Sequence, residues 1–111
     1  MPQEKYYSHE EIANLILGKQ IRINSGAGIS KGKIVSTHFK ERSGYHGSFL
    51  TITYTGEEFF FANIGTDKQS WTPKVEGKIC VSSWEKPFWR SPEETFRLSN
   101  FRGTHNITIS A

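Results

Sequence analysis

The residues best suited to bind an anion or to transfer protons lie between positions 31 and 46. Cationic and aromatic side chains alternate there, at Lys31, Lys33, His38, Lys40, Arg42, Tyr45 and His46. Lysine and arginine neutralise phosphates, and tyrosine and histidine rings can stack on bases. The stretch therefore predicts a surface that binds nucleic acid or a nucleotide-like small molecule. On a regular strand Lys31 and Lys33 share one face with Val35, and His38 lies on the other. A solvated, charged strand face is the alternative interpretation.

A second candidate site follows near residues 84–90, where aromatic rings alternate with positive charge. Trp84, Lys86, Trp89 and Arg90 are its expected ligand contacts. Tryptophan and arginine also dominate protein–protein hot spots, so Trp84, Phe88, Trp89 and Arg90 equally predict a protein-docking surface. Rings in such a segment alternatively cover a core. Trp71, in the preceding loop, is a candidate member of the same cluster.

Acid–base catalysis would need histidines that converge on a substrate atom. His38 and His46, with Lys40 beside them, suit a metal-independent nuclease in which one histidine takes a proton and the other returns it. Glu57 or Glu58 could serve as a base instead. Because the sequence does not show convergence, no catalytic residue is assigned. The single cysteine, Cys80, stands in an apolar run, which predicts a buried and inert thiol.

Metal and cofactor sites are not expected from the spacing of the ligand-type residues. The four histidines, at positions 9, 38, 46 and 105, lack the spacing of a helical metal motif, although His38 and His46 could meet across a hairpin. The glycine-rich residues 25–28, followed by Gly32 and Lys33, superficially suggest a phosphate loop. However, Ile34 stands where that motif requires serine or threonine, so a hairpin turn is predicted.

Length and composition predict one soluble domain. The chain has 111 residues, a formal charge of +3 and 14% aromatic residues. This length leaves room for one core. No apolar run approaches the ~20 residues of a membrane span, and the polar start lacks a signal-peptide core. We therefore expect a cytoplasmic protein without membrane contact, located in the host cytoplasm if the protein is viral.

A short helix is predicted over residues 9–17. Ser8 and Glu11 have the spacing of a capping box, and Tyr7 and Ile12 that of a hydrophobic staple. Ile12, Leu15 and Ile16 form one apolar stripe, and Gly18 ends the helix. So short a helix needs a partner, and the stripe is expected to close one open end of a curled sheet.

The remaining sequence reads as short strands. Alternation and β-branched residues predict strands at about 20–24, 29–39, 48–54, 57–63, 78–84 and 104–110. A tight turn at Thr55-Gly56 would join two of them into a hairpin. Pro92, at a capping-box spacing, predicts a short helical turn near residues 92–98.

These elements predict a mainly β (α+β) fold: a single curled sheet or small barrel of five to six strands, of SH3, Sm or OB size. The order of helix, strand, glycine turn and strand resembles that of Sm-like barrels. The resemblance covers residues 17–54 and rests on Leu17-Gly18-Lys19, Ile21, Ile23, Gly28, Gly32 and the strand at 49–54. It implies a small barrel.

Three classes of function follow in order of preference. The first is a non-enzymatic binder of an anionic ligand, with nucleic acid or a nucleotide-like anion as partner. The second is a protein-interaction module or inhibitor, such as a viral accessory protein that docks on a larger host enzyme. The third is the small nuclease with His38 and His46. The sequence leaves the oligomeric state open.

Overall fold

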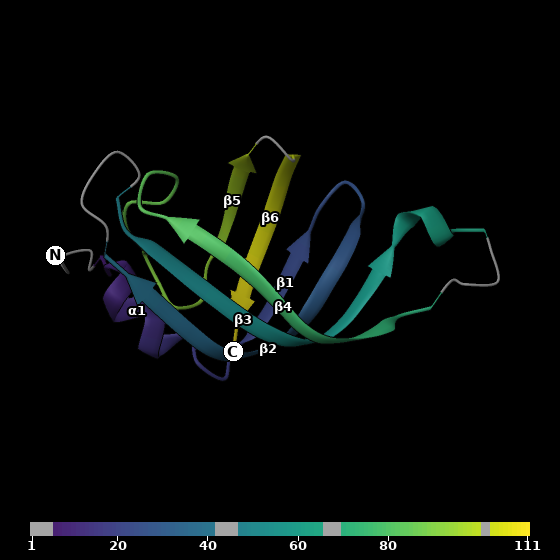
Figure 1. Cartoon of the computed structure of the whole chain (residues 1–111), viewed down its shortest axis with the longest axis horizontal. Coiled ribbons are helices and arrows are strands. Elements are labelled where there is room, and N and C mark those ends of the chain that lie inside the picture. The colour runs from purple at the N-terminus through teal and green to yellow at the C-terminus, as the bar shows by residue number, and fades with distance from the viewer. Residues whose placement is uncertain (1–5, 42–46, 66–69, 101–102) are drawn as a thin grey trace, which may run out of the picture.

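The described part of the chain, residues 6–41, 47–65, 70–100 and 103–111 of a computed structural model, forms an antiparallel sheet with one short α-helix (Figure 1). Its six strands lie in the order β4-β3-β2-β1-β6-β5. The elements are α1 (His9–Leu15), β1 (Gln20–Asn24), β2 (Gly28–Lys40), β3 (Phe49–Phe60), a 3₁₀ turn (Phe61–Asn63), β4 (Thr72–Ser82), β5 (Thr95–Asn100) and β6 (Gly103–Ser110). The expected mainly β fold with one helix is confirmed.

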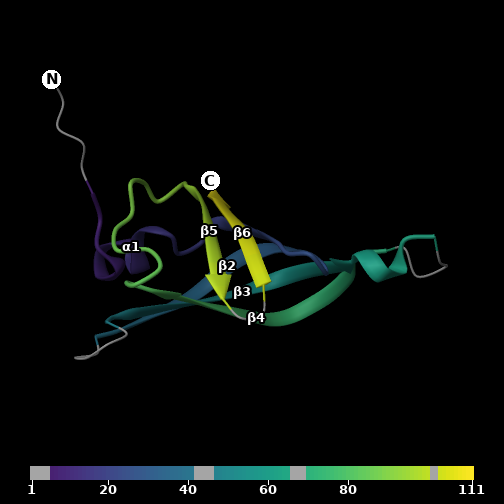
Figure 2. The same cartoon turned by 90° about the horizontal axis from the view of Figure 1, so that it is seen from above.

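The sheet is open, with β4 and β5 as its two edges. It curls strongly, so that β5 and β6 cross β4 in two perpendicular views (Figures 1 and 2). Within the described residues, no pairing joins these edges, and the closed barrel implied by the Sm-like resemblance is not formed. The order of helix, strand and glycine turn therefore describes only the first part of the chain, since closure depends on strands that lie outside it.

Helix α1 begins as the sequence predicts and ends two residues earlier. Ser8 and Glu11 form the capping box, with both hydrogen bonds at 3.2 Å. Gly18 follows the last turn with a φ of +82°, which glycine adopts without strain. The buried stripe consists of Ile12, Ala13 and Ile16, whereas Leu15 is 44% exposed, so its expected burial is wrong. No helix in the described ranges is long and apolar enough to cross a membrane.

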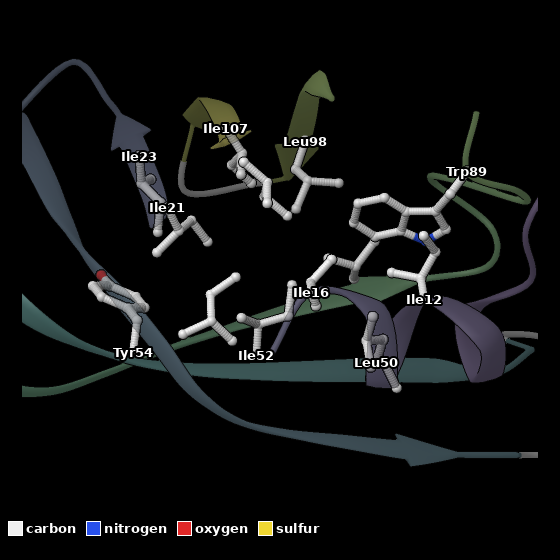
Figure 3. Packing of buried hydrophobic residues seen from close by; sticks show 14 residues of the cluster. Ile12, Ile16, Ile21, Ile23, Leu50, Ile52, Tyr54, Trp89, Leu98 and Ile107 are labelled. Atoms are coloured by element: carbon white, nitrogen blue, oxygen red, sulfur yellow. The ribbon is translucent and has the colours of Figure 1, made fainter. Parts of the chain in front are cut away.

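The core lies between the helix and one face of the sheet (Figure 3). The helix packs against β2 and β3, and the Thr37 hydroxyl donates a 2.6 Å hydrogen bond to the Ala13 carbonyl. Alternate residues of the strands supply the sheet side: Ile21, Ile23, Ile34, Leu50, Ile52, Tyr54, Val81, Leu98, Ile107 and Ile109. Trp89, from the loop after β4, is fully buried among them. We call this side the inner face and the opposite side the outer face.

The predicted hairpin at Thr55-Gly56 is wrong, because β3 runs unbroken through both residues. Gly56 lies opposite Gly32 of β2. A Cβ atom on Gly32 would come within 2.0 Å of the Thr55 carbonyl oxygen, so the two backbones approach more closely than side chains permit. The glycines that suggested a turn instead allow two long strands to cross tightly. By contrast, the predicted turn at 25–28 is confirmed, with the Ser25 amide donating to the Gly28 carbonyl at 2.9 Å.

Two further expectations differ from the structure at the sheet edges. Strand β4 begins at Thr72, before the strand predicted at about 78–84, and Pro73 is accommodated because an edge strand need not donate every ladder hydrogen bond. The helical turn near 92–98 is absent. The Ser91 hydroxyl accepts from the Glu93 amide at 3.1 Å in a local turn, and Thr95–Asn100 then forms β5 against β6. This strand buries Leu98, and Phe96 packs against the core.

The close approach at Gly32 makes a testable prediction. We expect Gly32→Ala to lower the free energy of unfolding by about 1–3 kcal/mol, because the added methyl group must displace the backbone of β3. Urea denaturation measures this. Gly26→Ala is the matched control, since a Cβ there meets nothing within 4 Å. Equal stability of the two variants would contradict a tight crossing at Gly32.

Candidate functional site

A β-bulge at Val35 determines how the cationic residues of β2 are arranged. Pairing with β3 shifts between Ile34, opposite Tyr54, and Ser36, opposite Thr53, so Val35 is the extra residue. Beyond the bulge the faces of β2 are exchanged relative to a regular strand. The simple alternation predicted from the sequence, with the lysines and His38 on opposite faces, is therefore wrong.

The bulge places His38 and Lys40 on the same outer face as Lys31 and Lys33. Lys31 pairs with Glu57 and Lys33 with Thr55, and beyond the bulge His38 pairs with Thr51 and Lys40 with Phe49. These four partners are all odd-numbered residues of the continuous strand β3, so they share one face. Paired residues of antiparallel strands share a face. All four cationic or titratable side chains are exposed. The structure thus combines the described members of the predicted anion-binding stretch on one side of the sheet.

Neighbouring strands add further cations to this face. Arg22 of β1 lies opposite Lys31, Lys78 of β4 opposite Thr53, and Arg97 reaches the same face through Asn106 of β6. Glu76 of β4 places its carboxylate 3.4 Å from the Lys78 ammonium, and among the described paired positions of the outer face Glu57 is the only acidic residue. Its contact with Lys31 is 3.9 Å long and half exposed, so it contributes little stability. Threonine and asparagine side chains occupy many of the intervening positions.

A depression of about 490 Å³ lies at the centre of the outer face. Its charged lining residues are Arg22, Lys31, Lys33 and Glu57, and Gln20, Thr55 and Ser110 are among its polar ones. It lies over the Gly32–Gly56 crossing, where the backbones are closest. Three cationic side chains and one carboxylate thus border a hollow rather than a flat surface.

An aromatic cluster borders the depression at one end of the face. The ring of Trp71 lies 5.8 Å from that of Phe59, and the Lys31 ammonium is 4.2 Å from the centre of the Trp71 ring. Trp71 is 36% exposed. It precedes β4, whereas Trp84 follows it, so these tryptophans lie at opposite ends of that strand and do not form the single cluster considered from the sequence. A stacking ring beside cations is a common arrangement for binding nucleotides.

Three predicted site residues, Arg42, Tyr45 and His46, lie outside the described residues. The convergence of His38 and His46 that a nuclease would require therefore stays a prediction. In the described ranges, no three histidine, cysteine or acidic side chains are grouped as metal ligands would be.

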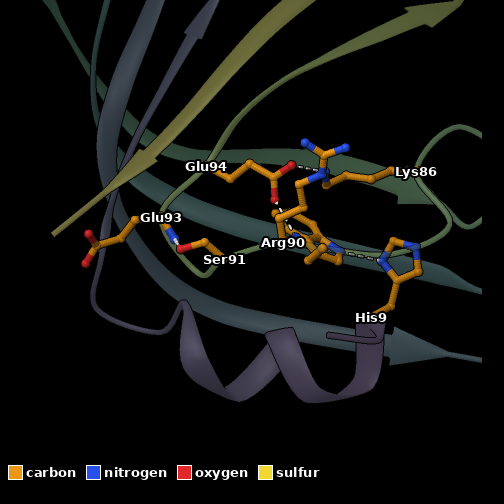
Figure 4. Close-up of polar contacts among 7 residues, drawn as sticks. His9, Lys86, Arg90, Ser91, Glu93 and Glu94 are labelled. Carbon is orange, nitrogen blue, oxygen red and sulfur yellow. Dashed lines mark hydrogen bonds and ion pairs between the residues drawn. The ribbon is translucent and has the colours of Figure 1, made fainter. Parts of the chain in front are cut away.

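The segment 84–90 divides into a buried and an exposed part. Trp89 belongs to the core, and its indole N–H donates to His9 Nδ1 at 3.0 Å. Lys86 is buried beside it, with its ammonium 2.6 Å from the Glu94 carboxylate (Figure 4). The second Glu94 oxygen accepts from the Arg90 amide at 3.0 Å. The predicted ligand contacts Lys86 and Trp89 thus anchor the loop to the helix and the sheet.

The other members of this segment remain at the surface. Trp84 is 69% exposed, Phe88 is 42% exposed and Arg90 is exposed. The Phe88 ring packs edge-on against Tyr6 with centroids 4.6 Å apart. We call the exposed rings of Tyr6, Trp84 and Phe88 the aromatic patch, within which Tyr6 and Phe88 are in contact.

Arg22, Lys78 and Arg97 come from three other strands and are not among the predicted site residues. Their place on the same face as the cations of β2 follows only from the pairing of the strands. The alternation of β1 could have shown that Arg22 points away from the buried Ile21 and Ile23. The predicted burial of Cys80 is wrong, and the alternation of side chains along β4 explains its exposure. Cys80 is exposed and pairs with Thr51 on the outer face, while its neighbours Ile79 and Val81 face inward.

Comparisons with known proteins add no assignment. The chain matches no protein-family model, and searches of curated proteins and of solved structures found no match.

The buried His9 predicts a pH-dependent stability. Burial lowers the pKa of this imidazole from 6.5, the Lys86 backbone opposes that effect, and the Lys86 charge adds to it. The unfolded chain therefore binds a proton near pH 6.5 more readily than the folded chain does. The contribution of the neutral imidazole to the free energy of unfolding is complete above that pH. It is lost progressively as the pH falls through and below it. We expect a lower melting temperature at pH 5.5 than at pH 7.5.

Replacement of the histidines separates His9 from other titrating groups. His9→Gln should reduce the difference in melting temperature between the two pH values, whereas His38→Gln, at an exposed position, should leave it unchanged. An undiminished pH dependence in His9→Gln would contradict the role given to this imidazole.

Proposed function

We propose that the protein is a non-enzymatic binding protein whose outer sheet face binds single-stranded nucleic acid. The observation that carries the proposal is the charge asymmetry of this face. Seven basic side chains occupy its paired positions: Arg22, Lys31, Lys33, His38, Lys40, Lys78 and Arg97. Two described carboxylates accompany them, because Glu57 pairs with Lys31 and Glu76 lies 3.4 Å from the Lys78 ammonium. A merely solvated face of a protein with mixed charges would be expected to carry the two signs in more equal number.

The spacing of the charges favours a polymer over a mononucleotide. Lys31 and Lys40 are nine residues apart on one strand, which corresponds to about 30 Å at about 3.3 Å per residue. One nucleotide could occupy only the central depression. A chain of phosphates could contact cations along the whole face and release counterions at each contact, which increases affinity at low salt.

The aromatic end of the face favours a single strand. Trp71 and Phe59 offer rings beside the Lys31 ammonium. Unpaired bases can stack on such rings, which contributes about 1–3 kcal/mol per base, whereas the bases of a duplex are already stacked on each other. Lys31 can at the same time contact the adjacent phosphate. This pairing of ring and cation supports binding without a sequence preference.

Binding to a labelled dT20 oligonucleotide, measured by fluorescence anisotropy between 50 and 300 mM NaCl, tests the proposal. We expect the affinity to fall steeply with salt. The double variant Arg22→Gln/Lys33→Gln should lower affinity roughly tenfold or more and reduce the salt slope by about 1.4, or about 0.7 for each lost phosphate contact. Arg90→Gln removes an exposed charge elsewhere and should change neither value.

The aromatic contribution is separated in the same assay. Trp71→Ala should weaken binding of dT20 by a factor of five or more and leave the salt slope nearly unchanged, because stacking releases no counterion. Trp71→Ala and the unchanged protein should bind duplex DNA with the same affinity. Absence of binding to both forms at 50 mM salt would refute the proposed function.

The exposed aromatic patch supports protein docking as a second candidate function. Tyr6, Trp84 and Phe88 expose large rings, Arg90 of the same segment is exposed, and tryptophan, tyrosine and arginine are the residue types enriched in hot spots. A pull-down from cell lysate with unchanged protein and with Trp84→Ser/Phe88→Ser would test it. A specific partner should be retained only by the unchanged protein. A partner retained equally by both, or none at all, would contradict docking through this patch.

A further inference from the structure

The buried imidazole of His9 is joined to Trp89 by a hydrogen bond that fixes its protonation state. His9 is the first residue of α1 and is only 4% exposed. Its Nδ1 atom lies 3.0 Å from the indole nitrogen of Trp89. An indole nitrogen can only donate, so Nδ1 must accept and cannot carry a proton in this contact. The imidazole is therefore neutral, with its hydrogen on Nε2.

A second proton on this ring would break the contact. It would occupy Nδ1, where two N–H donors would then face each other across 3.0 Å. The Nε2 atom offers no compensation, because it is buried and has no hydrogen-bond partner among the described residues. Burial lowers the pKa of His9, the Lys86 backbone only partly opposes this effect, and the Lys86 ammonium adds to it. Protonation of His9 and its contact with Trp89 therefore exclude each other.

The charged groups around His9 do not stabilise an imidazolium ion. Those of the two elements that meet here are Glu10 and Glu11 of α1 and Glu85, Lys86, Arg90, Glu93 and Glu94 of the loop between β4 and β5. Both Glu94 oxygens are already bonded, one to the Lys86 ammonium at 2.6 Å and the other to the Arg90 amide at 3.0 Å. The other four carboxylates are exposed to solvent, which screens their effect on a buried ring. A charge on His9 would therefore gain the Lys86 ammonium as a neighbour without a carboxylate to balance it.

The contact with His9 secures a junction between the N-terminal segment and the loop after β4. The Tyr7 amide donates to the Trp89 carbonyl at 2.7 Å, and the Trp89 amide donates to the Tyr7 carbonyl at 2.8 Å. Next to this bridge the rings of Tyr6 and Phe88 meet, with their centroids 4.6 Å apart. The aromatic patch is thus assembled in part across the junction that His9 and Trp89 hold together.

We propose that His9 is a pH-sensitive switch that holds residues 6–9 on the loop at neutral pH and releases them in acid. Release separates Tyr6 from Phe88 and so divides the aromatic patch. The sheet remains folded, because the pairing of β1, β2 and β3 does not involve His9, and local opening costs less free energy than global unfolding. The switch depends on neither proposed function. A protein docked on the aromatic patch would dissociate in acid, and this consequence alone rests on the second proposed function.

NMR spectroscopy of the full chain between pH 7.5 and pH 4.5 tests the switch. The carbon-bound ring protons of His9 report its protonation, nuclear Overhauser effects between the rings of Tyr6 and Phe88 report the junction, and the amide resonances of β2 and β3 report the sheet. We expect the Tyr6–Phe88 effects to be lost with a midpoint below pH 6.5 that coincides with the titration of His9. The resonances of β2 and β3 should change little over the same range.

His9→Gln separates the switch from other effects of acid. The glutamine oxygen can accept from the indole at every pH, so this variant should retain the Tyr6–Phe88 contact at pH 4.5. His105→Gln is the matched control, because it removes a titrating imidazole from β6 and should leave the transition unchanged.

The titration of the unchanged protein decides the inference even if His9→Gln fails to fold. The inference is overturned if the Tyr6–Phe88 contact persists after His9 is protonated, or if His9 stays neutral down to pH 4.5. It is equally overturned if the resonances of β2 and β3 disappear together with the contact, or if folded His9→Gln shows the same transition as the unchanged protein.

Discussion

The pairing of β2 with β3 is the constraint on which both faces of this molecule depend. The two strands pair from Gly28–Phe60 to Lys40–Phe49, and every other element is placed relative to them. Two local devices modify this pairing. The Gly32–Gly56 crossing brings the backbones close together, and the bulge at Val35 exchanges the faces of β2 midway along its length. Tight crossing and increased twist together favour a curled sheet over a flat one.

The inner face shows how a small domain obtains a core from such a sheet. A short amphipathic helix and one loop tryptophan cover the part of the face nearest the N-terminus. Trp89 is held by His9, and Lys86 and Glu94 neutralise each other beside it. Because the sheet is not closed, part of the inner face near the two edge strands stays uncovered by helix or loop. There a cleft lies open beside the core, with Ile23, Ile79 and Leu98 among the residues that line it.

The outer face has the opposite character. It contains threonine, asparagine and basic residues, with aromatic rings at one end. The exchange of faces at Val35 is the decisive step, because it adds His38 and Lys40 to the side that already carries Lys31 and Lys33. The like charges on this face repel one another. Solvent screening and the separation of the charges along the long strands weaken that repulsion. An extended polyanion would reduce this repulsion further, and that is the physical basis of the proposed function.

Local features of the sequence determined the capped helix, the turn at 25–28 and the mainly β character, because each depends on residues close together in the chain. The sequence also identified the region of positive charge. Which side that charge faces, and which of Arg22, Lys78 and Arg97 join it, was decided by the register of strands distant in sequence. The same holds for Thr55-Gly56 and for Trp89. Glycines suit a turn or a close crossing equally well, and a tryptophan suits a surface or a core. Only the tertiary structure selects between these roles, because the choice depends on which backbone or side chain lies opposite.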